Sequence, residues 1–265
     1  MTQDHSNVVR IKVHKEYSEV LAEFSSFFTA TVLNEESLIC TERLIKLNPS
    51  FYPAWKYRRS IIYSLGCDAR LEADLHLVRE WCIQFPKNFQ VWYHRQSIVT
   101  NCIEAGILQD IRQEILSIRK SFESDAKNYH AWNWLIWLVR HYSSQLVHLM
   151  DGELAFSAEL IVQDPYNNSA WNYRFFLLLD LGMLRSEAVE EELLYCQKWI
   201  LQHPENEAPW NYFGAIVRRF GVEDFAAFSL PVSPLSPLMT LEEKARIFAN
   251  ADSECKLWKF VLSKV

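Results

Sequence analysis

The sequence predicts an all-α fold, a right-handed solenoid or crescent of stacked helical hairpins, from three observations. The 265 residues are 49% hydrophobic and 14% aromatic but include only 6 glycines, which favours a large helical core over a many-turned β architecture. A short segment centred on tryptophan recurs five times. An amphipathic stretch separates neighbouring segments. Both halves of the recurring unit are therefore expected to be helical.

The five tryptophans of the repeat share their surroundings. They are Trp55, Trp92, Trp132, Trp171 and Trp210, separated by 37, 40, 39 and 39 residues. Proline stands six residues before the tryptophan in four of the five segments, and asparagine stands four residues before it in four of the five. The seventh residue after the tryptophan is aliphatic in every repeat. Because residues seven apart lie on one helix face, both are expected to be buried.

The proline and the asparagine predict where one helix ends and the next begins. Proline lacks an N–H group and disfavours helical geometry in the residue before it, whereas asparagine tolerates a turn conformation. The first helices of four repeats are expected near residues Leu71–Gln84, Leu108–Phe122, Leu154–Gln163 and Ser186–Gln202. Such hairpins bury their faces by stacking on their neighbours, so all the Pro-x-Asn loops should emerge along one edge.

The whole chain, residues 1–265, is predicted to form a single helical-repeat domain. Residues 1–28 are expected to be an N-terminal arm and a first helix, and residues 29–220 the five repeats. Residues 221–240 contain three prolines and are interpreted as a linker. Residues 241–265 are amphipathic and are predicted to form a capping helix over the open apolar end of the last repeat.

Arginine follows the tryptophan by three residues in three repeats, at Arg58, Arg95 and Arg174. One helical turn beyond the tryptophan, a guanidinium could bond carbonyl or acidic groups of the adjacent repeat, so these arginines are interpreted as structural. Leu135 and Phe213 hold this position in the third and fifth repeats, where such a network would be interrupted.

Charge and motifs limit the classes of function. A net charge of −6 argues against a binder of nucleic acid, and the longest apolar runs are too short to insert in a membrane. The six scattered cysteines and the polar N-terminus favour a cytoplasmic protein. No H-E-x-x-H, G-x-S-x-G or glycine-rich phosphate loop occurs, and no metal ligands are predicted. The chain is therefore not expected to be a catalyst on its own.

The repeat segments themselves resemble a known family. The segments PKNFQVWYHR, DAKNYHAW, NNSAWNYR and ENEAPWNY, with VVRIKVHKEYSEVLAEF before them and CKLWKF after them, are similar to the α subunit shared by protein farnesyltransferase and type I protein geranylgeranyltransferase. The resemblance covers nearly the whole chain. It implies an obligate heterodimer with a β subunit. That subunit carries zinc, and magnesium is a second candidate cofactor of the complex, while this chain binds no cofactor.

The activity implied by the resemblance is transfer of an isoprenoid from its diphosphate to the cysteine of a C-terminal C-a-a-X motif. Lys87 matches the lysine that reaches the diphosphate, and Gln90 matches the glutamine that bonds the carboxylate of the substrate peptide. Tyr129 and His130 match residues close to the diphosphate and substrate. The implied substrate-binding residues are Tyr52, Phe89, Gln90, Asn128, Tyr129 and His130. Without the resemblance, Lys87 would be interpreted as an exposed loop residue and Tyr129 as a packing aromatic.

Three positions depart from the family pattern. Phe89 stands where the family has tyrosine, Phe51 where the first repeat has asparagine, and Leu135 where the third repeat has arginine.

Two alternative functions stay open. One is the α subunit of the Rab-specific geranylgeranyltransferase, which NPSFYPAWKYRR resembles in part, and the other is a non-catalytic helical-repeat adaptor.

Overall fold

The structure is a computed structural model, and it describes residues 14–143, 149–203 and 205–220. These residues form α-helices α1 to α11 and two short helical turns, with no β-strand in the described ranges. The predicted all-α stack of helical hairpins is confirmed. The chain divides into two compact units, Met1–Trp134 and Leu135–Val265, with the boundary inside α7. Each unit is described by itself, and a single domain stays a prediction.

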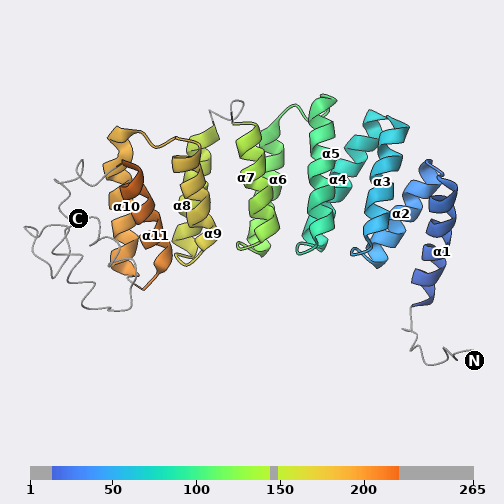
Figure 1. Ribbon diagram of the computed structural model, residues 1–265, viewed down its shortest axis with the longest axis horizontal. Helices are drawn as coiled ribbons and strands as arrows, with labels where there is room; N and C mark the ends of the chain where they lie inside the picture. The colour runs from blue at the N-terminus through green and yellow to red at the C-terminus, as the bar shows by residue number, and fades with distance from the viewer. Residues whose placement is uncertain (1–13, 144–148, 204, 221–265) are drawn as a thin grey trace, which may run out of the picture. The chain divides into compact units, whose positions relative to one another are not determined.

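The first unit contains α1 and three hairpins (Figure 1). Its helices are α1 (Lys15–Ala30), α2 (Glu35–Leu47), α3 (Tyr52–Leu65), α4 (Asp68–Gln84), α5 (Phe89–Glu104), α6 (Ile111–Ser124) and the start of α7 (Tyr129–His141). α3, α5 and α7 each carry a repeat tryptophan, and α4 and α6 match the two amphipathic stretches predicted in this half.

The second unit contains the end of α7 and the last two hairpins. Its other helices are α8 (Met150–Gln163), α9 (Asn168–Phe175), the π-helical turn η2 (Phe176–Asp180), the 3₁₀ turn η3 (Ser186–Ala188), α10 (Val189–Gln202) and α11 (Glu207–Phe220). The predicted N-terminal arm up to residue 13, the linker over 221–240 and the capping helix over 241–265 lie outside the described residues. No helix in the described residues is long and apolar enough to cross a membrane.

The repeat tryptophans form the core of both units. All five are at most 5% exposed, and four of the aliphatic residues seven positions later, Ile62, Val99, Val139 and Leu178, are also buried. Four of the five described cysteines are buried as well, and Cys67 is exposed. The predicted burial of the tryptophan face is therefore confirmed wherever the side chains are described.

Each tryptophan also fixes the loop that precedes it. The indole Nε1 donates a hydrogen bond to the carbonyl oxygen six residues earlier in four repeats: Pro49 (2.7 Å), Pro86 (2.9 Å), Ala126 (2.9 Å) and Pro165 (2.9 Å). The bond satisfies the one polar atom of a side chain that is otherwise apolar and buried. Proline at this position ends one helix, and its carbonyl anchors the next.

The asparagine four residues before the tryptophan links successive loops. The Asn128 Oδ1 atom accepts hydrogen bonds from the backbone N–H groups at the start of α7, and its Nδ2 atom donates to the Pro86 carbonyl at 2.9 Å. Asn206 makes the same bond to Pro165 at 2.7 Å in the second unit. The Pro86 and Pro165 carbonyl oxygens also accept hydrogen bonds from the indoles of Trp92 and Trp171, which belong to the preceding repeats. One carbonyl thus joins two neighbouring repeats.

We predict that Asn128→Ala destabilises the chain more than Asn88→Ala does. Asn88 is half-buried and caps α5 through one bond to Gln90 N, whereas Asn128 is fully buried and both ends of its amide are bonded. Loss of the helix cap lowers the free energy of unfolding by about 1 kcal/mol. For Asn128, the additional loss of the buried hydrogen bond to the Pro86 carbonyl should bring the decrease to about 2–3 kcal/mol. Urea unfolding of the two variants measures the difference. Equal losses would contradict a linking role for Asn128.

Candidate functional site

The loops before α3 and α5 of the first unit, Pro49-Ser50-Phe51 and Pro86-Lys87-Asn88, enclose an open pocket with a volume of about 540 Å³. It lies at the N-terminal ends of α3 and α5 and is lined by Pro49, Ser50, Phe85, Pro86, Lys87, Asn88, Phe89 and Gln90. Three residues of the predicted site, Lys87, Phe89 and Gln90, are therefore gathered in one pocket. The backbone N–H groups at the start of α5 add positive electrostatic potential there.

Lys87 is the cation of this pocket. Its side chain is 73% exposed, and its Nζ atom forms an ion pair with the Asp125 carboxylate from the corresponding loop of the next repeat. The hydrogen bond from Lys87 lowers the pKa of Asp125 below its usual range. Because a surface ion pair of this kind contributes about 1 kcal/mol or less, Lys87 can leave Asp125 for an anionic ligand at small cost.

The neighbouring side chains form an aromatic ledge over the starts of α5 and α7. The Phe89 ring stacks on Tyr93 with centroids 6.1 Å apart, and its centroid lies 6.3 Å from that of His130. The Tyr129 centroid is 5.7 Å from His130, and Phe89 and Tyr129 are 61% and 70% exposed. The Oε1 atom of Gln90 is buried and has no hydrogen-bond partner. The ledge thus places exposed aromatic rings beside the amide group of Gln90.

Two other predicted site residues have different surroundings. Tyr52 begins α3 and is 51% exposed, but it does not line the pocket. Asn128 is 0% exposed, and its amide is used by the backbone of α7 and by Pro86. Its side chain is therefore committed to the fold, and a contact between Asn128 and substrate stays a prediction.

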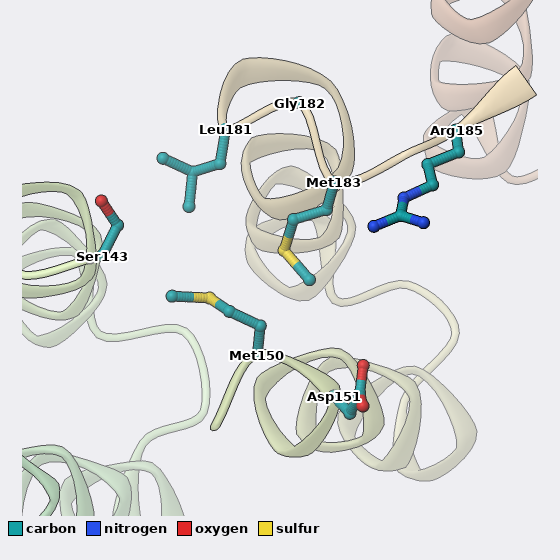
Figure 2. Close-up of a pocket in the computed structure, with 7 residues that line it drawn as sticks. All are labelled: Ser143, Met150, Asp151, Leu181, Gly182, Met183 and Arg185. Carbon is teal, nitrogen blue, oxygen red and sulfur yellow. The ribbon is translucent and has the colours of Figure 1, made fainter. Parts of the chain in front are cut away.

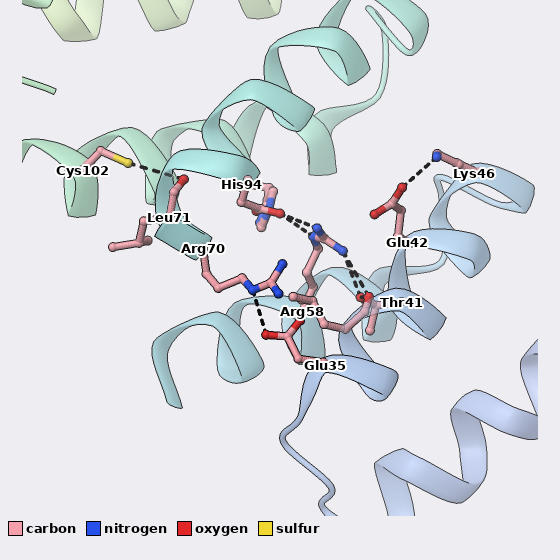
Figure 3. A network of polar contacts seen from close by, with 11 residues as sticks. Glu35, Thr41, Glu42, Lys46, Arg58, Arg70, Leu71, His94 and Cys102 are labelled. Atoms are coloured by element: carbon pink, nitrogen blue, oxygen red, sulfur yellow. Dashed lines mark hydrogen bonds and ion pairs between the residues drawn. The ribbon is translucent and has the colours of Figure 1, made fainter. Parts of the chain in front are cut away.

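The three repeat arginines form buried ion pairs with acidic residues of the following repeat. The Nε atoms of Arg58, Arg95 and Arg174 lie 2.8, 2.6 and 2.6 Å from carboxylate oxygens of Asp74, Glu114 and Glu192. Figure 3 shows Arg58 between Thr41 on α2 and His94 on α5, with the exposed Arg70–Glu35 pair nearby. Arginine therefore joins consecutive hairpins, as its position suggested.

Sequence reasoning missed the three carboxylates that receive these arginines, and also Glu153, which holds the same position in the fourth repeat but bonds Tyr173. Asp74, Glu114, Glu153 and Glu192 each stand 18 residues before the tryptophan of their own repeat, and all four are buried. The residue two after that tryptophan also bonds the carboxylate. The bonds are His94–Asp74 (2.6 Å), Trp134–Glu114 (3.1 Å), Tyr173–Glu153 (2.7 Å) and Tyr212–Glu192 (2.8 Å). The constant spacing of an acidic residue within an apolar pattern was the signal that could have revealed them.

His94 is neutral in this network. It is fully buried, and burial lowers its pKa below the ordinary value of 6.5. Its Nε2 atom donates to Asp74, while Nδ1 has no partner, which suits an unprotonated nitrogen and not an N–H group. Asp74 is ionised, since Arg58 and His94 outweigh the effect of burial and lower its pKa to about 2.

We therefore predict that acidification below pH 6.5 destabilises the chain through His94. The unfolded state takes up this proton below the ordinary pKa of 6.5 and the folded state only at lower pH, so stability is present above 6.5 and is lost as pH falls. The slope should reach about 1.4 kcal/mol per pH unit for one proton. His94→Gln, which keeps a donor for Asp74, should flatten the stability profile measured by urea unfolding between about pH 7 and pH 5. The exposed His76, changed in the same way, is the control, and an unchanged slope in His94→Gln would contradict the assignment.

A second pocket lies in the second unit, with a volume of about 550 Å³. Figure 2 shows its lining, which comes from the residues after α7, the start of α8 and the loop after η2: Ser143, Met150, Asp151, Leu181, Gly182, Met183 and Arg185. No residue of the predicted site lines this pocket. No group of three or more histidine, cysteine or acidic side chains is placed to hold a metal ion within the described ranges.

Five hairpins, each with a tryptophan at the repeat position and tied by Asn-to-carbonyl bonds and buried ion pairs, define a class of helical-repeat protein. Five stretches match the family described as protein prenyltransferase alpha subunit repeat: residues 34–65, 71–102, 111–142, 150–181 and 189–220. Each stretch covers one of the hairpins above. The chain belongs to this family.

Individual relatives support the assignment. The geranylgeranyl transferase type-2 subunit alpha of Candida albicans is 28% identical over 142 residues, which is 50% of this chain and 38% of that protein. The human protein prenyltransferase alpha subunit repeat-containing protein 1 is 28% identical over 144 residues, or 46% of this chain and 35% of that protein. The aligned parts span about a third of the length of these curated relatives.

A solved structure matches over the whole chain. It is described as Candida albicans protein geranylgeranyltransferase-I complexed with GGPP, and it superposes with a TM-score of 0.76 at 25% identity, covering 100% of this chain and 95% of that chain. The curated matches thus include type-2 alpha subunits, whereas the solved structure is a type I enzyme. The type of transferase is therefore part of the proposal that follows.

Proposed function

We propose that this chain is the α subunit of a heterodimeric, cytoplasmic protein prenyltransferase and is inactive without its β subunit. The observation that carries the proposal is the pocket in which Lys87, Phe89 and Gln90, from one Pro-x-Asn loop and the start of α5, face the preceding loop at Pro49 and Ser50. Membership of the prenyltransferase alpha subunit repeat family supports the pairing with a β subunit. In the proposed heterodimer, the β subunit covers the open side of this pocket, and the two chains together enclose the active site.

The chemistry of transfer requires a cation at this place. As the bond from C1 of the isoprenoid to the diphosphate breaks, negative charge grows on the leaving group, and a preorganised donor stabilises it. Lys87 Nζ is exposed at the pocket and exchanges Asp125 for the diphosphate. Closure by the β subunit would exclude water and strengthen this interaction.

The peptide substrate would be oriented by the neighbouring polar and aromatic groups. In the proposal, Gln90 bonds the terminal carboxylate through its amide nitrogen, and Phe89, Tyr129 and His130 form the wall beside the isoprenoid diphosphate. Zinc, held by the β subunit, would bind the substrate cysteine and favour loss of its thiol proton, so that the thiolate is the nucleophile. Phe89 has no hydroxyl group, so this wall contributes packing at a position where a tyrosine would also donate a hydrogen bond.

The leading substrate class is a protein with a C-terminal C-a-a-X motif, which the match to a type I enzyme over 100% of this chain supports. The second candidate is a type-2 transferase directed at Rab proteins. The similarity to type-2 alpha subunits of Candida albicans and Saccharomyces cerevisiae, at 28% and 30% identity, favours it.

Coexpression with three β subunits, from farnesyltransferase and from the type I and type-2 geranylgeranyltransferases, tests the proposal. If the leading class is right, we expect stable heterodimers with the farnesyltransferase and type I β subunits; if the second candidate is right, we expect one with the type-2 β subunit alone. In either case the heterodimer should transfer a labelled isoprenoid. Transfer to a C-a-a-X peptide identifies the leading class, and transfer to an intact Rab protein only in the presence of its escort protein identifies the second. A chain that forms no complex and supports no transfer with any of the three would contradict the proposal and favour an adaptor.

A further inference from the structure

Arg59 is a buried cation on an aromatic face of the first unit. It lies on α3, is 9% exposed, and its guanidinium carbon is 4.8 Å from the centre of the Tyr93 ring on α5. Tyr52 and Tyr63 lie on the same helix, seven residues before Arg59 and four residues after it, spacings that place them on the same helix face. We call Arg59 and these three tyrosines the Arg59 site.

Arg59 differs from the other buried arginines of the described residues. Arg58, Arg95 and Arg174 each bond a buried carboxylate. Arg59 forms no ion pair within the described ranges, and its Nη1 atom is buried without a hydrogen-bond partner. Burial lowers the pKa of Arg59, since the charged form loses water without gaining a carboxylate. Such a group is costly in the free chain unless an anion arrives from outside.

The tyrosines around Arg59 form a preorganised rim. Tyr52, Tyr63 and Tyr93 are 51%, 42% and 46% exposed. The Tyr63 hydroxyl is hydrogen-bonded to Ser97 Oγ and accepts a second bond from Asn101 Nδ2 at 3.2 Å, while the Tyr93 ring stacks on Phe89. A buried cation beside half-exposed aromatic side chains has the composition of a binding hot spot, in which the aromatic side chains help to exclude water from the central contact.

We propose that the Arg59 site receives an aspartate or glutamate side chain of the β subunit, an inference that rests on the proposed function. The guanidinium group matches a carboxylate in charge and in planar geometry, and the tyrosine rim suits a protein surface. Arg59 does not line the pocket of Lys87, so the carboxylate and the isoprenoid diphosphate occupy separate places. The three paired arginines stabilise the fold, whereas Arg59 contributes to binding of the β subunit.

The test measures the dissociation constant of the heterodimer formed with the β subunit that pairs. Arg59→Met keeps the length and the packing of the side chain but removes its charge, and we expect it to weaken the complex by roughly 10- to 100-fold. Arg59→Lys should lose less. The control is Arg43→Met on α2, which removes an exposed arginine paired with Glu23 and should change the constant by less than about twofold.

Thermal unfolding of the isolated variants separates assembly from folding. Since Arg59→Met removes an uncompensated buried charge, its midpoint should equal or exceed that of the wild type, whereas Arg58→Met should unfold at a lower temperature. A single Asp→Asn or Glu→Gln change on the β subunit should reproduce the loss and should not add to that of Arg59→Met.

Three results would overturn the inference. One is a heterodimer of Arg59→Met as tight as the wild type, and another is a lower unfolding temperature of the isolated variant, which would make Arg59 structural. A third is weaker binding of the isoprenoid diphosphate with unchanged pairing, which would make that anion the occupant. In each case transfer by the wild-type heterodimer leaves the proposed function standing. A wild-type chain that pairs with no β subunit overturns both.

Discussion

Lys87→Ala is expected to lower the rate of isoprenoid transfer in the heterodimer by about 10- to 1000-fold, with little change in stability. The reason is that Lys87 is the cation of the pocket at the start of α5, and its side chain is 73% exposed in the free chain. The exposed ion pair with Asp125 contributes little to folding. Single-turnover transfer from saturating isoprenoid diphosphate measures the chemical step, and thermal unfolding measures the fold.

Asp125→Asn separates a catalytic Lys87 from a merely structural one. This change breaks the same ion pair but leaves the lysine in place. If Lys87 stabilises the leaving group, Asp125→Asn should transfer at a rate near that of the wild type, because the freed Nζ atom needs no exchange of partners. If the ion pair itself matters, both variants should lose the same activity. Wild-type single-turnover rates in Lys87→Ala would refute the role.

The repeat residues were enough to predict the hairpins because each acts within its own segment. Trp92 closes its loop on the Pro86 carbonyl and buries its ring, and both effects are fixed by spacing along one short stretch. The C-terminal ends of α4, α8 and α10 were predicted for the same reason, whereas the observed starts of α4, α6 and α8 lie at Asp68, Ile111 and Met150 and not at the predicted Leu71, Leu108 and Leu154. The π-helical turn at Phe176–Asp180 was not predicted, since Leu178 keeps its buried place and the apolar pattern is unbroken.

Contacts between repeats were harder to predict than contacts within them. The pairing of Lys87 with Asp125 and of Arg58 with Asp74 depends on which loop or helix of the next repeat lies opposite, and spacing alone does not give that. Asn128 illustrates the result. The sequence placed it beside a substrate by resemblance, and the structure shows its amide bonded to the Pro86 carbonyl of the preceding loop.

Pocket residues and buried networks also differ in how their roles can be inferred. Gln90 and Phe89 were assigned by resemblance, and the structure adds that they share a pocket with Lys87. Arg59 drew no attention in the sequence because it follows Arg58, which has the repeat position. Its distinction is the lack of a carboxylate partner in the described residues, which only the packing of α3 on α5 reveals.

The largest loss of stability is expected from Glu114→Gln. Glu114 is 0% exposed and accepts hydrogen bonds from Arg95, Arg79 and Trp134, and although burial alone would raise its pKa, Arg95 lowers the pKa below the usual range. Removing its charge leaves the cation of Arg95, itself 1% exposed, buried without a counter-ion. Loss of one partner from a buried ion pair costs about 3–5 kcal/mol.

The matched control for Glu114→Gln is Glu123→Gln, which changes an exposed glutamate of the same helix α6. Because a repeat array transmits stability mainly between neighbours, amide hydrogen exchange should show the loss of protection in α4 to α7 before the rest of the chain. Replacing both partners, as Glu114→Leu with Arg95→Met, should recover most of the stability, since two apolar groups need no counter-ion. If the free energy of unfolding of Glu114→Gln lay within about 1 kcal/mol of that of the control, Arg95 would have found another acceptor. The buried carboxylates would then not be what holds the hairpins together.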